Sequence, residues 1–174
     1  MKMDRTSEMQ AKPLLLVDID GVISLWGFPM DMRPPGAFAV IDGIPHFLST
    51  RAAEHLLALQ GAFELAWCSG WEEKADEHLP HLLGVPRGLP HLTFERSRAD
   101  VSARAHWKLA AIDAFAGPDR ALAWIDDAFN DACHAWAAER GAPTLLVETE
   151  PRDGLREDHA ATLAAWAKDL DAAA

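Results

Sequence analysis

The chain has 174 residues, of which 49% are hydrophobic and 25% charged, so it can bury the core of one folded domain and is not of the disordered class. Its formal net charge of −11 disfavours non-specific binding to nucleic acid or anionic lipid. No apolar run approaches the roughly 20 residues that span a bilayer. The charged residues 1–12 lack the apolar stretch of a signal peptide and predict a flexible leader. We therefore expect one domain over residues 13–172, in the cytoplasm and without a membrane partner.

Cysteine usage agrees with that location. The chain has only Cys68 and Cys133, too few for a disulfide framework or a Cys-based zinc site. Each flanks an apolar segment, which predicts a buried, reduced thiol.

Five short apolar segments are typical of buried strands, and they alternate with segments that predict helices. The expected strands are residues 14–17, 62–69, 91–94, 121–125 and 144–148. The expected helices are residues 51–60 (capped by Thr50), 71–83, 107–115, a segment ending at Gly141, and 155–170. Asp42-Gly43 predicts a hairpin within residues 37–49. The alternation predicts an α/β fold, with a mostly parallel, five-stranded sheet between two layers of helices.

Carboxylates follow the first expected strand, where ligands bind in such sheets. Asp18 comes directly after four apolar residues, and Asp20 stands two positions on. Residues two apart in extended chain point the same way, so the two carboxylates are expected to converge. An ordinary Asp-Gly turn explains Asp20 but not Asp18, because a partly buried carboxylate beside a like charge is unfavourable without a neutralising cation or proton.

A second acidic pair, Asp126-Asp127, follows the fourth expected strand. One of the two could cap the next helix, but two adjacent acids exceed what a cap requires. Asp131, one turn further on, is by itself typical of a solvated helix charge. If the first and fourth strands are neighbours, the four aspartates form an oxygen-only set, which suits Mg²⁺.

Two further residues could hold a phosphate. Ser69 ends the second expected strand, and Ser69-Gly70-Trp71-Glu72 also matches a capping box, S-x-x-E. The hydroxyl and the N–H groups from Gly70 onward would cradle a phosphate at a helix start, so both interpretations can hold together. Lys108 is ambiguous: most lysines at helix starts are solvated, but a cation is unfavourable near a helix N-terminus, which hints at an anionic partner.

Taken in order, these residues resemble the four motifs of the haloacid dehalogenase (HAD) superfamily of phosphatases. The sequence Asp18-Ile-Asp20-Gly-Val matches D-x-D-G-V, Ser69 matches the second motif, and Lys108 the third. The fourth motif, an acidic pair after a strand, matches Asp126-Asp127. The match extends from residue 14 to about residue 131, and its first and fourth motifs are the specific ones.

The resemblance implies a Rossmann-like α/β/α sandwich and a Mg²⁺-dependent phosphatase. By that resemblance Asp18 is the nucleophile, Asp20 the general acid and base, and Ser69 and Lys108 bind the phosphoryl oxygens. Mg²⁺ would be held by the Asp18 carboxylate, the Asp20 carbonyl and the acidic pair, with Asp127 favoured over Asp126 as the direct ligand. A second Asp in the first motif argues against dehalogenase chemistry.

The intervals between motifs leave room for a short hairpin flap but for no large cap, so an open site is expected. Such a site would accept a phosphate on a small molecule or on a macromolecule. The chain also resembles a small HAD branch of RNA-repair proteins, which would make it a nucleic-acid end-processing phosphatase. The basic residues before the fourth motif, Arg96, Arg98, Arg104 and Lys108, would then hold a second phosphate or a nucleic-acid backbone, although a solvated basic loop explains them equally well.

Two other classes of protein remain as alternatives. A phosphoacceptor receiver domain would need its acidic pair on the first strand and an Asp after the third, and neither is present. A non-catalytic relative that binds partners would keep the fold without the activity. Trp26 and Trp71 follow the first two motifs and could line the site, although packing explains them as well.

Overall fold

The central element is a four-stranded parallel sheet, seen in a computed structural model that describes residues 11–95 and 105–173. Its strands are β1 (Leu14–Val17), β5 (Glu64–Trp67), β6 (Leu122–Asp126) and β7 (Thr144–Glu148), in the order β5-β1-β6-β7. The structure thus confirms the predicted α/β class with a parallel sheet. Most of the predicted leader, together with Arg96, Arg98 and Arg104, lies outside the described residues.

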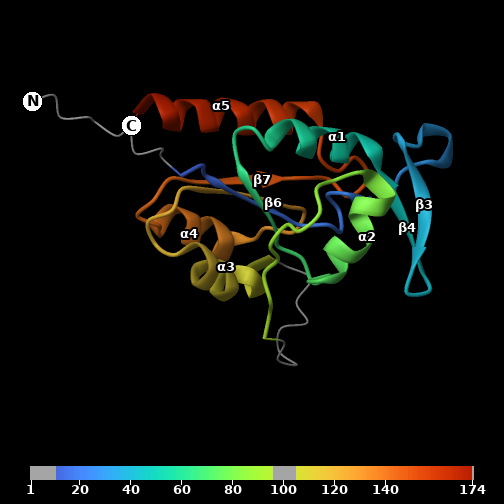
Figure 1. The fold of residues 1–174 in the computed structure, drawn as a ribbon, viewed down its shortest axis with the longest axis horizontal. Coiled ribbons are helices and arrows are strands. Elements are labelled where there is room, and N and C mark those ends of the chain that lie inside the picture. Colours follow the sequence, from blue (N-terminus) through green and yellow to red (C-terminus); the bar gives the residue numbers. More distant parts are fainter. Residues whose placement is uncertain (1–10, 96–104, 174) are drawn as a thin grey trace, which may run out of the picture.

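Helices cover both faces of this sheet (Figure 1). On one side lie α1 (Thr50–Leu59) and α5 (Glu157–Ala173), and on the other α3 (Leu109–Ala116) and α4 (Asp131–Glu139). The helix α2 (Lys74–Leu83) follows β5, and two short 3-10 helices, η1 (Met30–Met32) and η2 (Ala105–Lys108), lie in connecting segments. None of the described helices is both long and apolar enough to cross a membrane.

Strand β1 explains why the core has two halves. Leu15 and Val17 belong to the cluster that includes side chains of α1, α2 and α5, whereas Leu14 and Leu16 belong to the cluster with α3 and α4. Successive side chains of a strand point to opposite faces, so a continuous apolar run is the pattern of a strand covered on both sides. Burial on both faces fixes the position of the carboxyl end of β1.

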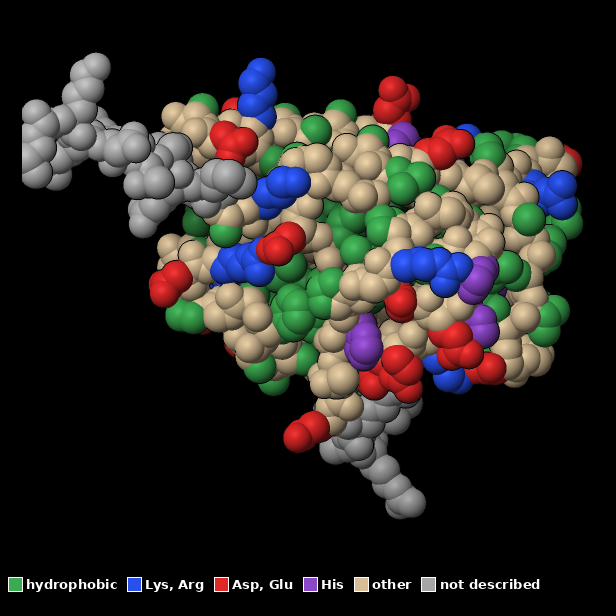
Figure 2. Space-filling model, in the orientation of Figure 1, with side chains coloured by type: hydrophobic (Ala, Val, Ile, Leu, Met, Phe, Trp, Pro, Cys, Tyr) green, Lys and Arg blue, Asp and Glu red, His purple; other side chains and the backbone are tan. Residues whose placement is uncertain are grey.

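The predicted hairpin is confirmed and belongs to a separate antiparallel sheet. Its strands are β2 (Ser24–Leu25), β3 (Gly36–Ile41) and β4 (Ile44–Ser49), in the order β2-β4-β3. Asp42 (φ 51°) and Gly43 (φ 79°) form its turn, as expected of an Asp-Gly pair. Apolar side chains are exposed on this hairpin, among them Phe38, Val40 and Ile44. Figure 2 shows apolar side chains at that end, among charged ones, and charges of both signs across the face in view.

One expected strand is missing from the sheet, which has four strands rather than five in the described part of the chain. Residues 91–94 form only an isolated bridge, between His91 and Trp67, supported by the bond from the Leu92 N–H to the Trp67 carbonyl. Pro90 precedes this segment and lacks an N–H to donate, which limits a ladder here. The predicted cap of α1 is also shifted by one residue, because Ser49 is extended and its Oγ accepts from the Ala52 N–H at 3.1 Å.

Candidate functional site

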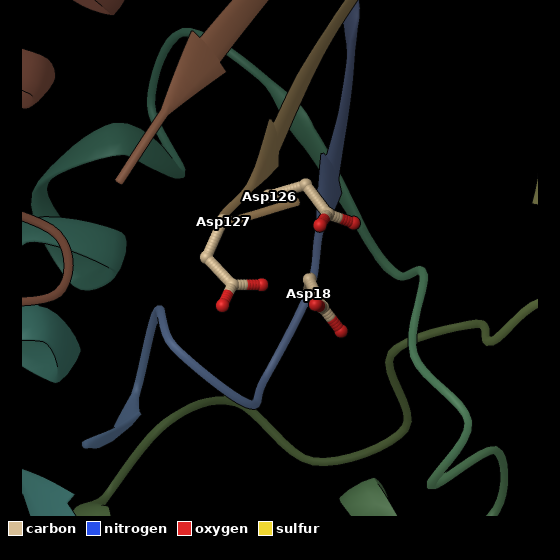
Figure 3. Close-up of side chains that lie close together, drawn as sticks. All are labelled: Asp18, Asp126 and Asp127. Carbon is tan, nitrogen blue, oxygen red and sulfur yellow. The ribbon is translucent and has the colours of Figure 1, made fainter. Parts of the chain in front are cut away.

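The acidic residues after β1 and β6 lie together because these two strands are neighbours. Val17 pairs with Ile125, and the Asp18 N–H donates to the Ile125 carbonyl at 3.0 Å. Asp18, Asp126 and Asp127 each offer a carboxylate oxygen within 4.8 Å of the others. Figure 3 shows these three side chains gathered where the two strands end. The predicted convergence of the first motif with the acidic pair is therefore seen for three of the four carboxylates.

Lys108 is the counterion of this cluster. Its Nζ lies 3.1 Å from Asp18 Oδ1 and donates to Asp126 Oδ2 at 2.6 Å and to the Cys68 carbonyl at 3.0 Å. The side chain is only 5% exposed. A buried ammonium requires such partners, because desolvation of an unpaired charge is strongly unfavourable. Lys108 ends η2, whose position is held in part by the bond from the Ala105 N–H to the Ala128 carbonyl.

Within the described part of the chain, the carboxylates of the cluster outnumber its cations. Burial raises the pKa of Asp18 to about 8, against the opposing effect of Lys108. Burial, and then the charge of Asp126, raise the pKa of Asp127 to about 6. For Lys108, burial opposes the charged form, but Asp18 and Asp126 together raise its pKa. Among the described residues, three carboxylates face one ammonium, so the site favours an additional cation or bound protons.

The donor set fits Mg²⁺, which prefers carboxylate oxygens at about 2.1 Å. Ligand oxygens on opposite sides of one such ion lie about 4 Å apart, so these carboxylates need only a small contraction to share it. Asp126 Oδ2 accepts from Lys108, and its Oδ1 accepts from the Ala128 N–H at 3.1 Å. Both oxygens of Asp126 thus have donors, which leaves Asp18 and Asp127 better suited to contact a metal directly.

Gly21 and Thr149 support the acidic pair. A Cβ at Gly21 would collide with the carboxylate of Asp127, and Gly21 has φ 79°, which glycine adopts without strain. Thr149, directly after β7, donates from Oγ1 to the Gly21 carbonyl at 2.9 Å and from its N–H to the Asp126 carbonyl at 3.0 Å. Sequence reasoning did not select Thr149. Thr149 could have been found because it is a polar residue that directly follows a strand of the sheet, as the residues of the first and fourth motifs do.

Asp20 has a different environment from Asp18. Its Oδ2 accepts a hydrogen bond from the indole Nε1 of Trp71 at 3.0 Å, and its carboxylate is not in the three-carboxylate cluster. The chain turns after Asp18, because the N–H groups of residues 22, 23 and 24 all donate to the Ile19 carbonyl. The rule that residues two apart share a direction holds for extended chain and does not apply across this turn. Of Trp26 and Trp71, it is Trp71 that contacts a candidate site residue.

Ser69 and Gly70 lie in the loop between β5 and α2. The buried Ser69 Oγ accepts from the Trp71 N–H at 3.4 Å, and its carbonyl accepts from the Glu72 N–H at 3.1 Å. Because α2 begins only at Lys74, the sequence Ser69 to Glu72 forms a turn and not the capping box that its pattern predicted. Ser69 is adjacent to Cys68, whose carbonyl binds Lys108, so the second and third motifs meet beside Asp18.

The helix after the acidic pair has its own cap. Asn130 Oδ1 accepts from the Cys133 N–H at 3.3 Å, so neither Asp126 nor Asp127 caps α4. Asp131 is exposed in the first turn of α4, as expected of a solvated charge.

Both cysteines are buried and free, as predicted, and burial raises the pKa of the Cys68 thiol.

Comparison with models of protein families finds none that matches this chain. Comparison with curated protein sequences finds no match either. The function proposed below therefore depends on the site itself and on the motif pattern.

Proposed function

We propose that this protein is a Mg²⁺-dependent phosphatase of the HAD type that acts through an aspartyl-phosphate on Asp18. The observation that carries the proposal is the meeting of Asp18, Asp126 and Asp127 at adjoining strand ends, with Lys108 buried between Asp18 and Asp126. A phosphate dianion can approach Asp18 only where cations offset the carboxylates. Lys108 and a divalent ion would supply that charge.

The reaction has two steps. In the first, a carboxylate oxygen of Asp18 bonds to phosphorus as the bond between phosphorus and the ester oxygen breaks. Asp20 gives its carboxylic proton to the ester oxygen, and the alcohol leaves. In the second, a water molecule gives a proton to Asp20 and bonds to phosphorus while the bond to Asp18 breaks. Inorganic phosphate is released, and both aspartates return to their initial states.

The other residues bind the phosphoryl group and the metal. From its position beside Asp18, Lys108 would bind oxygens of the transferred phosphoryl group. The Ser69 hydroxyl and the Gly70 N–H would bind another oxygen of the same group. Asp18, Asp127 and the Asp20 carbonyl would hold Mg²⁺, with Asp126 fixing Lys108. When bound, Mg²⁺ supplies positive charge that stabilises the transition state and orients the phosphate.

The strand order supports a HAD-like arrangement. Because β1 lies between β5 and β6, the first motif falls between the second and the fourth, which the proposed roles require. The insertion between β1 and α1 holds only η1 and the small antiparallel sheet, which is consistent with a site without a large cap. Substrates would then include phosphate esters of small molecules and of macromolecular ends. The basic residues Arg96 and Arg98, on which a nucleic-acid preference would depend, are outside the described residues.

The test is hydrolysis of 4-nitrophenyl phosphate with Mg²⁺, with EDTA, and by the Asp18→Asn variant. We expect turnover that requires Mg²⁺ and falls at least about a thousandfold in the variant, since the nucleophile is lost. Asp31→Asn is the matched control, because Asp31 is exposed in η1 and should leave activity unchanged. Turnover that persists in Asp18→Asn would refute the mechanism. Absence of turnover in the wild type with every phosphate ester tried would favour a non-catalytic, partner-binding role.

A further inference from the structure

Trp71 contacts the carboxylate of Asp20. Its indole N–H donates to Asp20 Oδ2 at 3.0 Å, across 51 positions of sequence. We propose that Trp71 is a positioning residue that fixes Asp20 for proton transfer, an inference that rests on the proposed phosphatase function. The bond is to Oδ2, so the proposal assigns proton transfer with the substrate ester oxygen or water to Oδ1, the second carboxyl oxygen.

His46 and Ser24 hold Trp71 in place from the small antiparallel sheet. The His46 ring packs edge-on against Trp71, with ring centroids 4.8 Å apart. On its other side, His46 Nδ1 is hydrogen-bonded to the Ser24 Oγ at 2.9 Å, and Ser24 is buried in β2. Ser24 also bridges back to Asp20, and its carbonyl accepts from the Gly21 N–H at 2.8 Å. The contacts thus close a ring that begins and ends at Asp20.

The loop that carries Trp71 has a defined shape. Glu72, the next residue, has φ 50°, a conformation unfavourable by about 1 kcal/mol or more for a residue with a side chain. The Trp71 backbone N–H donates to Ser69 Oγ in the second motif, and its indole N–H donates to Asp20 in the first motif. Trp71 therefore links the two motifs by hydrogen bonds. Trp71 is only partly buried, so packing alone does not account for the direction of its indole N–H.

This arrangement makes a prediction that depends on the leaving group. A phenolate that leaves poorly needs the proton from Asp20 as its bond to phosphorus breaks, whereas 4-nitrophenolate leaves without it. Because kcat/KM covers the steps up to release of the alcohol, it isolates the acid role of Asp20 from its later role as base. Misplacement of Asp20 should therefore lower kcat/KM for phenyl phosphate selectively.

The experiment compares phenyl phosphate and 4-nitrophenyl phosphate, two esters of similar size, in the wild type and in Trp71→Phe. This variant keeps the ring but loses the donor. We expect kcat/KM for phenyl phosphate to fall about tenfold, the upper end for loss of a hydrogen bond to an uncharged carboxyl group. For 4-nitrophenyl phosphate the fall should stay within about threefold, and Mg²⁺ affinity should be unchanged. Trp26→Phe, at an exposed tryptophan of the neighbouring segment, is the matched control and should alter neither ester.

Equal losses on both esters, or no loss on either, would overturn the positioning role while leaving the phosphatase function standing. A wild type inactive on both esters would overturn the function and this inference together. If Trp71→Phe does not fold, His46→Leu decides, since it removes the bond to Ser24 and leaves Trp71 intact. A smaller but equally selective loss supports the proposal, and an unselective loss refutes it.

Discussion

Replacing Lys108 by Met should destabilise the protein in a way that depends strongly on pH. The side chain is 5% exposed and is the buried counterion of Asp18 and Asp126. Removing one partner of a buried ion pair typically lowers the free energy of unfolding by about 3–5 kcal/mol. Methionine fills a similar volume, so the loss reflects charge and not a cavity. We expect a loss of this size at pH 8 without Mg²⁺.

The pH dependence follows from proton uptake. In the wild type, the pKa of Asp18 is raised to about 8 from 3.8, so its contribution to stability is present at low pH and is lost as pH rises toward 8. Without the ammonium of Lys108, the buried cluster must take up about one further proton on folding. Each such proton makes stability fall by about 1.4 kcal/mol per pH unit. The loss caused by Lys108→Met should therefore be small at pH 5.

Urea denaturation at pH 5 and at pH 8 measures both values through the midpoint and slope of unfolding. Lys168→Met is the matched control, because Lys168 is exposed on α5 and its loss should change stability by less than about 0.5 kcal/mol at either pH. An equal loss at the two pH values, or a loss below about 1 kcal/mol at pH 8, would show that Lys108 is not the counterion inferred from its contacts.

Two further predictions concern the metal site. Because the pKa of Asp127 is raised to about 6, protons should compete with Mg²⁺ for its carboxylate. Titration calorimetry should therefore find weaker Mg²⁺ binding at pH 5.5 than at pH 7.5. An affinity that does not change with pH would contradict this. Gly21→Ala should weaken Mg²⁺ binding and lower stability by more than Gly43→Ala does. Both glycines have φ 79°, so the backbone strain is the same. A Cβ at Gly21 collides with Asp127, whereas nothing lies within 4 Å of a Cβ at Gly43. Thermal unfolding and Mg²⁺ titration of the pair test this, and equal effects would argue against the role given to Gly21.

Much of the fold was predictable because strong local signals agree with the tertiary structure. Apolar runs bounded by polar residues identified β1, β6 and β7, and Asp42-Gly43 identified the hairpin. Residues 91–94 were wrongly predicted as a strand, because an apolar run by itself does not show whether a neighbouring strand can supply a full ladder. The actual segment follows Pro90 and makes only one bridge.

The candidate site was predictable in so far as it follows from strand order. Once β1 and β6 are neighbours, Asp18 and the acidic pair must meet, and no side-chain detail is needed. Lys108 was ambiguous in sequence, because a lysine at a helix start is usually solvated. Its burial depends on contacts with Cys68 and Asp126, which are 40 and 18 positions away. Long-range packing of this kind has no local signature.

Asp20 shows how the small antiparallel sheet could contribute to the site. The periodicity of an extended strand places Asp20 beside Asp18, but three N–H groups converge on the Ile19 carbonyl and turn the chain. That turn leads into β2, and β2 pairs with β4, which carries His46 to the edge of Trp71. The same turn that separates the two aspartates therefore assembles the contacts around the second one. Under the proposed mechanism the separation is useful, because a nucleophile must stay ionised beside cations while an acid must hold a proton away from them.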